Sequence, residues 1–251
     1  DLLMVAHRII RECDSAEAAM RRYRGGWIGR VRIGTTNTAL QYLLPPVLRK
    51  LATEYPGLDL HITNLPTRES IEAVRDHRID LAIVTLPVDS DRIEVTPLYQ
   101  DRMVAIFPAG AKEIPEVASP TSLADWPCLM EHTRAALYEM VMGWFTSQGI
   151  QPRIVMHLGT VEALKSAVES HLGMALIPDM VIGRHEPNIV VRSLAPELSR
   201  TLALIEHRSR ESDHAYDIVR NALRELRSAT HARKPTVSER ENALRTGRKR
   251  L

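Results

Sequence analysis

Residues 29–38, GRVRIGTTNT, contain the pattern that decides the fold. Their apolar residues Val31 and Ile33 alternate with arginines, as in a half-buried β-strand, and the small polar residues that follow end this strand. Apolar residues then recur at helical spacing between Leu40 and Leu51. A strand, a polar turn and a helix in this order are typical of an α/β protein.

The same order of strand and helix repeats along the rest of the chain. A helix that contains Ile71 and Val74 begins at a predicted cap, Thr67, and the apolar face of the last helix runs from Tyr216 to Leu226. Because helices separate the strands, we expect parallel sheets with helices on both faces, arranged as two consecutive lobes. After the first strand, the expected strands cover residues 58–62, 79–84, 103–108, 128–130, 154–156, 174–177 and 202–205.

The composition is that of a globular protein and excludes several classes. Of the 251 residues, 44% are hydrophobic and 25% are charged, which does not fit a disordered or collagenous chain. Two cysteines, Cys13 and Cys128, are too few for a disulfide framework or a Cys-rich zinc site, so we expect a reducing, cytoplasmic location. The longest stretch without a charge, 33–48, is too short and polar to cross a bilayer, and the N-terminus lacks the features of a secretory signal, so no membrane partner is expected.

The first residues predict a long amphipathic helix over residues 1–24. Its charged residues fall off a heptad seam, so the helix is able to pair with a copy of itself through Leu2, Ile9 and Met20. We therefore expect a homodimer or homotetramer. An ordinary helix that packs on its own domain is the alternative. The seam consists of Leu2, Ala6, Ile9, Cys13, Ala16, Met20 and Tyr23.

Charge is concentrated at the other end of the chain. Residues 229–251 hold seven Lys or Arg and two Glu, a net charge of +5. Because the whole chain has a net charge of +2, the other residues carry a net charge of −3. The body of the protein is therefore not basic. We interpret residues 229–251 as a solvated, flexible tail, with an electrostatic contact to nucleic acid as the alternative.

The motifs of several enzyme classes are absent from the sequence. It contains no G-x-S-x-G nucleophile elbow, no phosphate-binding or dinucleotide-binding glycine loop and no H-E-x-x-H zinc helix. No two of the ten histidines are spaced i, i+4, and no C-x-x-C pair is present. We expect no catalytic residues, no metal and no cofactor, although a nucleophile with partners from distant loops is not excluded by spacing. His157 and His171 are expected to be ordinary polar residues.

Small polar residues follow several of the predicted strands, just before the next helix. The N-terminus of a helix binds anions, and ligands of open α/β sheets bind beyond the carboxyl ends of the strands. Arg134 could pair with a carboxylate, or it could face solvent. The alternative for the polar residues is that they are simple N-caps. The candidate ligand-binding residues are Thr35, Thr36, Asn37 and Thr85 on the first lobe, and His132, Thr133 and Thr160 on the second.

Seven short blocks of the sequence follow one another in a recognisable order: residues 29–34, 43–45, 55–56, 78–83, 97–99, 149–152 and 173–178. Together they resemble the effector-binding region of LysR-type transcriptional regulators. The resemblance covers residues 1 to about 227 and includes the heptad segment, which is similar to the linker helix of that family. It implies two Rossmann-like subdomains joined by two crossing strands, at 103–108 and 202–207, in the type 2 periplasmic-binding-protein fold. A small effector would bind in the cleft.

The resemblance also implies the domains and the function that we expect. The protein would be the ligand-sensing and oligomerising region of a regulator with a small effector. The helix N-termini described above favour an anionic effector, and the missing catalytic motifs favour a protein that is not an enzyme. The family's winged helix-turn-helix is absent from this sequence, so DNA binding is expected of a longer parent chain. A periplasmic-type solute-binding protein is the alternative. The expected domains are the linker helix 1–24, subdomain I at 30–105 plus 208–228, subdomain II at 106–207, and the basic tail 229–251.

Overall fold

The computed structural model describes residues 2–22, 28–133, 135–183 and 185–229. Arg134 and almost all of the expected basic tail lie outside the described residues. The chain divides into two compact units. Unit 1 combines Asp1–Gln100 with Thr201–Thr230, and unit 2 is built on Asp101–Arg200. The predicted α/β fold with two subdomains is confirmed.

Unit 1 is built around a central strand whose neighbours run parallel to it. β1 (Gly29–Thr35) pairs in parallel with β2 (Leu58–Asn64) and with β3 (Leu81–Thr85), and β3 pairs antiparallel with β9 (Ser199–His207). The side chains of Val31 and Ile33 are fully buried, as their alternation predicts. The helices of unit 1 are α1 (Leu2–Arg22), α2 (Pro45–Glu54), α3 (Thr67–Arg75), α6 (His214–Arg224) and α7 (Leu226–Ala229), with a π-helical turn, η1 (Ala39–Leu43), before α2.

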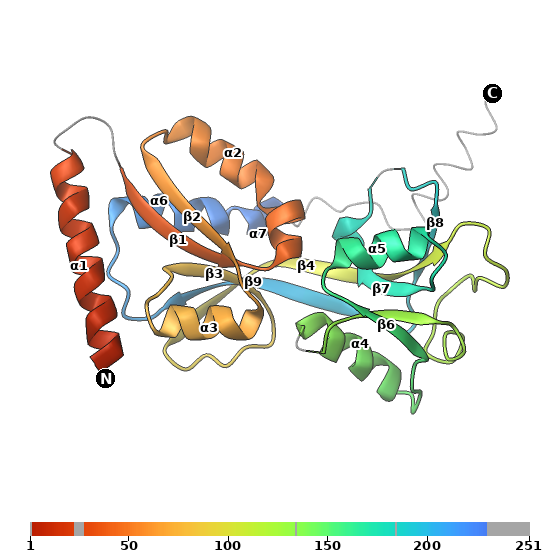
Figure 1. Ribbon diagram of the computed structural model, residues 1–251. Coiled ribbons are helices and arrows are strands. Elements are labelled where there is room, and N and C mark those ends of the chain that lie inside the picture. The colour runs from red at the N-terminus through yellow and green to blue at the C-terminus, as the bar shows by residue number, and fades with distance from the viewer. Residues whose placement is uncertain (1, 23–27, 134, 184, 230–251) are drawn as a thin grey trace, which may run out of the picture. The chain divides into compact units, whose positions relative to one another are not determined.

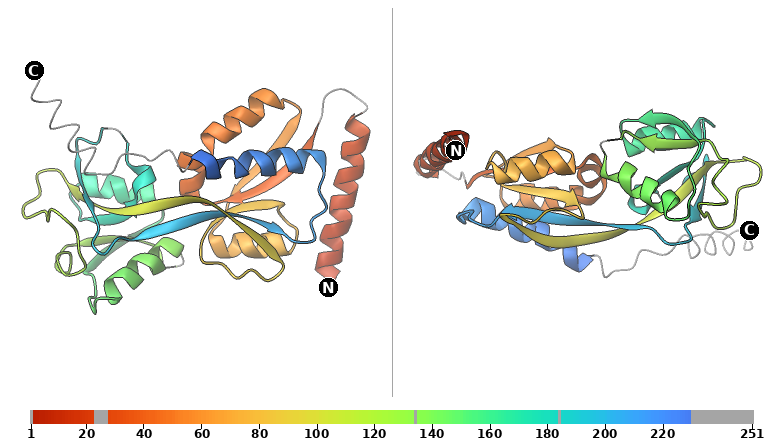
Figure 2. Two further views of the ribbon diagram at one scale, coloured as in Figure 1. Left: turned by 180° about the vertical axis from the view of Figure 1, so that it is seen from behind. Right: turned by 90° about the horizontal axis from the view of Figure 1, so that it is seen from below.

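Helices cover both faces of β1, as predicted. A Cβ atom on Gly29 would lie 2.6 Å from the Cβ of Ala215 on α6, so this helix packs directly on the strand. Gly34 lies five positions after Gly29, so a Cβ atom there would point to the opposite face of the strand. The side chains nearest to that position include Ser70 of α3. Figure 1 shows α3 and α2 with the strands between them, and the left view of Figure 2 shows α6 beside α2.

The start of α3 differs from the prediction. Thr67 is the first helical residue and Pro66 takes the N-cap position without a side-chain hydrogen bond. The Thr67 hydroxyl instead accepts the backbone N–H of Thr85, at 3.2 Å. The predicted cap is therefore wrong, because a tertiary contact to the end of β3 uses the hydroxyl.

Unit 2 contains a second set of strands and helices. Cys128, the first residue of β5, and Met174, directly before β7, form an isolated bridge. β8 was not predicted, although its first three residues, Ile-Val-Val, carry the β-branched signal of a strand. The elements of unit 2 are β4 (Ile93–Pro108), β5 (Cys128–Glu131), α4 (Ala136–Thr146), β6 (Ile154–Leu158), α5 (Val161–Glu169), β7 (Ala175–Pro178), the 3-10 turn η2 (Asp179–Val181) and β8 (Ile189–Ser193), with β4 beginning in unit 1.

Two long strands, β4 and β9, pass from one unit to the other. They are neighbours in the sheet, and the boundary between the units falls within each of them. The predicted crossings at 103–108 and 202–207 form their C-terminal parts. Because β9 returns antiparallel to β3, and because β4 pairs antiparallel with β7 and β8, the sheet is mixed. The expected parallel pairing is found among β1, β2 and β3 and between β5 and β6. For the other strand pairs the expectation of parallel sheets was wrong.

Candidate functional site

The first candidate turn of unit 1 is held by its own hydrogen bonds. Thr35, the last residue of β1, is fully buried, and its hydroxyl donates to the carbonyl of Thr36 at 3.4 Å. The Thr36 hydroxyl accepts the N–H of Ala39 at 3.4 Å, and the Asn37 amide oxygen accepts from Gln41 at 3.3 Å. Thr36 is half-buried, and because its oxygen accepts, its O–H stays able to donate to a ligand.

Thr85 lies at the same edge of the sheet, because β3 runs parallel to β1 (Figure 1). It is the last residue of β3 and is buried. No helix follows Thr85 directly, since the chain passes through Pro87 into β4. The expectation of a strand-to-helix turn at this place was therefore wrong, and of the two candidate turns of unit 1 the one at residues 35–38 leads into a helical turn.

The candidate residues of unit 2 follow two adjacent parallel strands. β5 and β6 pair in parallel, with Glu131 opposite Leu158, so the segments after both strands meet at one edge. Thr160 is the N-cap of α5, and its hydroxyl accepts the N–H of Ala163 at 3.1 Å. His132 and Thr133 are exposed. Thr133 caps no helix, because α4 has Ala135 at its N-cap position.

Glu131 is a polar residue at this edge that the sequence reasoning did not select. Burial, opposed by Arg200 and helped by Glu162, raises the pKa of its carboxyl to about 7. The backbone carbonyl of Glu131 also lies 3.2 Å from Nδ1 of His157. Below about pH 7 the carboxyl is protonated and is able to donate a hydrogen bond to a ligand. A glutamate directly after the apolar residues of a strand was the available signal.

The charge of Arg200 is already balanced by a buried carboxylate. Its Nε and Nη2 donate to one oxygen of Asp101 at 3.2 and 3.1 Å, and the other oxygen accepts the N–H of Met180 at 3.2 Å. Both side chains of the pair are at most 5% exposed. Burial raises the pKa of Asp101, and Arg200 opposes this shift. The ion pair therefore links β4 to β9, and Asp101 also binds η2. The charge of Arg200 is thus not available to an anionic ligand.

The exposed part of α1 includes residues on the predicted seam and off it. On the seam, Ile9 is 57% exposed and Cys13 is exposed, while Ala6 is half-buried. The apolar residues Met4, Val5 and Ile10, which lie off the seam, are exposed as well. His7 and Arg11 are the half-buried polar residues of this helix. The side chains of Leu2 and Met20, the other two predicted oligomerisation residues, lie outside the described set.

The part of the chain that the structure describes offers neither a metal site nor a membrane-spanning helix. No group of three or more His, Cys, Asp and Glu side chains is arranged to hold a metal ion among these residues. No described helix combines the length and the apolar character that crossing a membrane requires.

Comparison with known families decides what this arrangement belongs to. The model of the family described as LysR substrate binding domain matches residues 24–228. The chain belongs to this family. Its relatives are transcriptional regulators and not enzymes, as the sequence predicted. One of them, "Probable RuBisCO transcriptional regulator" of Thalassiosira pseudonana, is 25% identical over 88% of this chain and 76% of its own length.

Solved structures show the same fold for this LysR substrate binding domain. The effector binding domain of QuiR in complex with shikimate has a TM-score of 0.72 at 17% identity, over 80% of this chain and 98% of that chain. The BenM effector binding domain with its effector benzoate has a TM-score of 0.69 at 19% identity, over 82% of this chain and 95% of that chain. These likenesses confirm the type 2 periplasmic-binding-protein fold.

Proposed function

We propose that this chain is the effector-sensing and oligomerising region of a cytoplasmic LysR-type regulator, and that its effector is a small anion. Family membership favours a regulator over a periplasmic-type solute-binding protein. Regulators of this family bind small-molecule effectors, form oligomers and bind DNA. In this proposal, DNA is bound by a helix-turn-helix domain of a longer parent chain.

The observation that supports an anionic effector most directly is the turn after β1. Thr36 is half-buried and its O–H is able to donate, beside the backbone N–H groups where η1 begins. Thr160 stands at the start of α5 in unit 2. QuiR and BenM are described with shikimate and benzoate, and both of these ligands are carboxylates. We propose that a carboxylate is held by the turns of both units, with Thr35, Thr36, Asn37, Thr85, His132, Thr133 and Thr160 as contributing residues.

The proposed signal is a shift between arrangements of the protein. An effector changes the balance between two conformations only by binding one of them better than the other. We propose that the favoured conformation is passed to the DNA-binding domains through α1, which pairs with its copy in a homodimer or homotetramer. The exposed Ile9 supports this role for α1.

A thermal-shift screen of small carboxylic acids against their primary amides tests the proposal. The amide keeps the shape of each acid but removes its charge, so it serves as the matched control. A ligand that binds only the folded protein stabilises it by RT ln(1 + [L]/Kd), which is about 2.7 kcal/mol at a hundred times Kd. We expect one acid to raise the melting temperature saturably and its amide not to do so. Equal shifts for an acid and its amide would contradict an anionic effector.

A further inference from the structure

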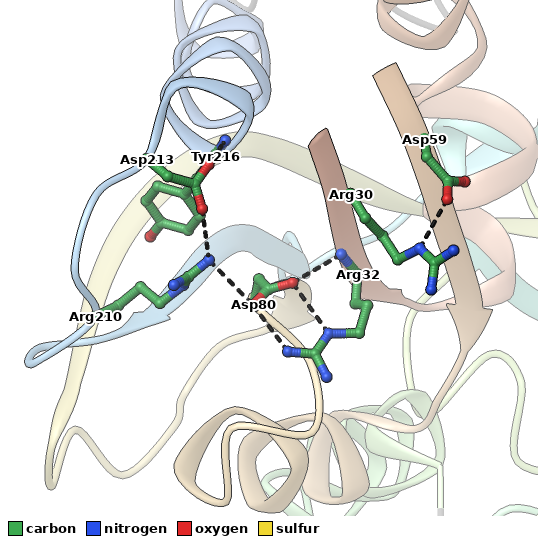
Figure 3. A network of polar contacts seen from close by, with 7 residues as sticks. All are labelled: Arg30, Arg32, Asp59, Asp80, Arg210, Asp213 and Tyr216. Atoms are coloured by element: carbon green, nitrogen blue, oxygen red, sulfur yellow. Dashed lines mark hydrogen bonds and ion pairs between the residues drawn. The ribbon is translucent and has the colours of Figure 1, made fainter. Parts of the chain in front are cut away.

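A second cluster of charged residues lies in unit 1, at the end of the sheet opposite to Thr35 and Thr85. Its centre is Asp80, directly before β3, whose side chain is 4% exposed. Arg32 of β1 donates to Asp80 through its backbone N–H at 2.9 Å and through Nε and Nη2 at 3.2 Å. Arg210, after β9, approaches the same carboxylate at 3.4 Å (Figure 3). Asp80 is thus occupied by two guanidinium groups.

A third arginine, Arg11 of α1, is half-buried and lies close enough to this cluster for its charges to act on it, and no described carboxylate forms an ion pair with it. Burial and then the charge of Arg210 lower the pKa of Arg11, and Arg32 acts in the same direction, while Asp80 and Glu12 oppose them. Asp213 compensates Arg210 alone, because one of its oxygens caps α6 at Tyr216 and the other accepts from Arg210 at 3.3 Å. Three guanidinium groups therefore share one buried carboxylate, part of Asp213 and the exposed Glu12.

Several buried donors of this cluster have no acceptor among the described residues. Nε of Arg11 and Nε of Arg210 are both in this state. In His207, Nδ1 accepts the backbone N–H of Ser209 at 3.1 Å, so the neutral ring carries its proton on Nε2. This Nε2 is buried and also has no partner among the described residues. Nδ1 of His7, one helical turn before Arg11, is likewise buried and unpaired. A buried donor without an acceptor costs about 1–3 kcal/mol, so several in one place indicate a missing acceptor.

We propose that a small oxyanion, such as sulfate or phosphate, is bound by Arg11, Arg210 and His207 together and ties α1 to the rest of unit 1. Guanidinium groups recognise such anions through charge-assisted, often bidentate hydrogen bonds. The anion would supply the acceptors that the buried donors lack and would offset the excess positive charge. This site is separate from the proposed effector site, which lies at the carboxyl ends of β1 and β3.

The site makes a prediction about pH. Burial lowers the pKa of His77 to about 4, helped by Arg11, His207 and Arg210 and opposed by Asp80. Burial also lowers the pKa of His207, helped by Arg11 and Arg92. The rings of His77 and His207 are 4.2 Å apart. A bound anion raises both pKa values, so binding takes up protons, and affinity rises as the pH falls from 7.5 to 5.5. Sulfate stays divalent in this range and adds no titration of its own.

Titration of the protein with sodium sulfate, by calorimetry and by melting temperature, tests this proposal. Ionic strength is held constant with sodium chloride, because sulfate also stabilises proteins non-specifically. Arg11→Gln removes the excess cation from α1. Arg30→Gln is the matched control, because Arg30 lies on β1 two residues from Arg32 but pairs with Asp59 at 2.7 Å, outside the cluster (Figure 3). His207→Phe is a second variant, which removes the Nε2 donor and keeps an aromatic ring against His77.

We expect saturable sulfate binding by the wild type and by Arg30→Gln, tighter at pH 5.5 than at pH 7.5. Arg11→Gln and His207→Phe should bind about tenfold more weakly or worse. A sulfate effect that does not saturate, or that is the same in all four proteins, would overturn the proposal.

Discussion

At the scale of single residues, Thr160 has two roles that substitution can separate. Its hydroxyl caps α5 and is also a proposed ligand donor. We expect Thr160→Val to lower the free energy of unfolding by about 1 kcal/mol, since the cap is lost, and to weaken effector binding by about 5- to 150-fold. Thr160→Ser, which keeps the hydroxyl, is the control. Urea unfolding and calorimetry measure the two effects, and a stability loss without an affinity loss would leave Thr160 as a cap only.

Thr36 isolates the ligand contact more cleanly. Its hydroxyl accepts the N–H of Ala39 at a long 3.4 Å, so the turn depends on it less than α5 depends on Thr160. We expect Thr36→Val to weaken binding of the effector by the same 5- to 150-fold with little change in the apo melting temperature. Calorimetric titration with the acid found in the screen measures this. Unchanged affinity in Thr36→Val and in Thr160→Val would remove both turns from the site.

Glu131 makes stability depend on pH in a direction opposite to that of most carboxylates. Its pKa is about 7 in the folded protein against 4.5 as its ordinary value, so the folded state holds a proton that the unfolded state has lost between these pH values. Stability therefore falls as the pH rises from 4.5 to 7, by about 3 kcal/mol in total. We expect Glu131→Gln to stabilise the protein at pH 8 but hardly at pH 4.5. Urea unfolding at both pH values measures this effect, with Glu139→Gln on the exposed face of α4 as the control. Equal effects at the two pH values would contradict the assignment.

At the scale of elements, α1 is the helix whose interface can be tested directly. Ile9 is 57% exposed, so the helix does not bury it against its own unit. An aspartate at a paired apolar seam would be desolvated without a partner. We expect Ile9→Asp with Met20→Asp to weaken the oligomer in sedimentation experiments. Arg8→Asp, at the neighbouring exposed position off the seam, should leave the assembly unchanged. The same assembly in all proteins would mean that α1 is not a principal interface.

The elements also show how far the sequence determines this fold. Strands with a continuous apolar run, such as Leu81–Thr85, and helices with a strong apolar face, such as His214–Arg224, could be predicted from spacing alone. The direction of β9 could not, because antiparallel pairing with β3 is a contact between segments far apart in the chain. The role of the Thr67 hydroxyl depends on the same kind of contact.

In the candidate sites, too, some features follow from the local sequence and others only from tertiary contacts. The polar turns after β1 and β6 could be found because a turn residue and a helix start are neighbours in sequence. The raised pKa of Glu131 depends on burial and on Glu162 and Arg200, which only the folded chain brings near it. The cluster around Asp80 likewise combines α1, β1 and the segment after β9. Local patterns thus predict positions on elements, and burial and charge require the tertiary structure.

At the scale of the whole molecule, the proposed effector must be detected by both units. When any ligand binds the folded state, the exchange rates of all amides that exchange by global unfolding fall by one common factor. Amides of exposed turns exchange by local opening, so they slow further only where the ligand holds the turn closed. The helix α6, whose apolar face is buried, provides the common factor, and the segments 35–41 and 159–165 report the turns of unit 1 and unit 2.

We therefore expect hydrogen exchange, measured by mass spectrometry with a saturating effector, to slow in both turn segments beyond the factor seen in α6. Thr36→Val at equal occupancy should reduce the extra protection in residues 35–41, because its hydroxyl no longer holds the ligand against that turn. Extra protection in one unit alone would contradict an effector that contacts both. The signal to the DNA-binding domains would then have to start from one unit alone. The reason is that a ligand shifts a conformational equilibrium only when it binds the two states with different affinity.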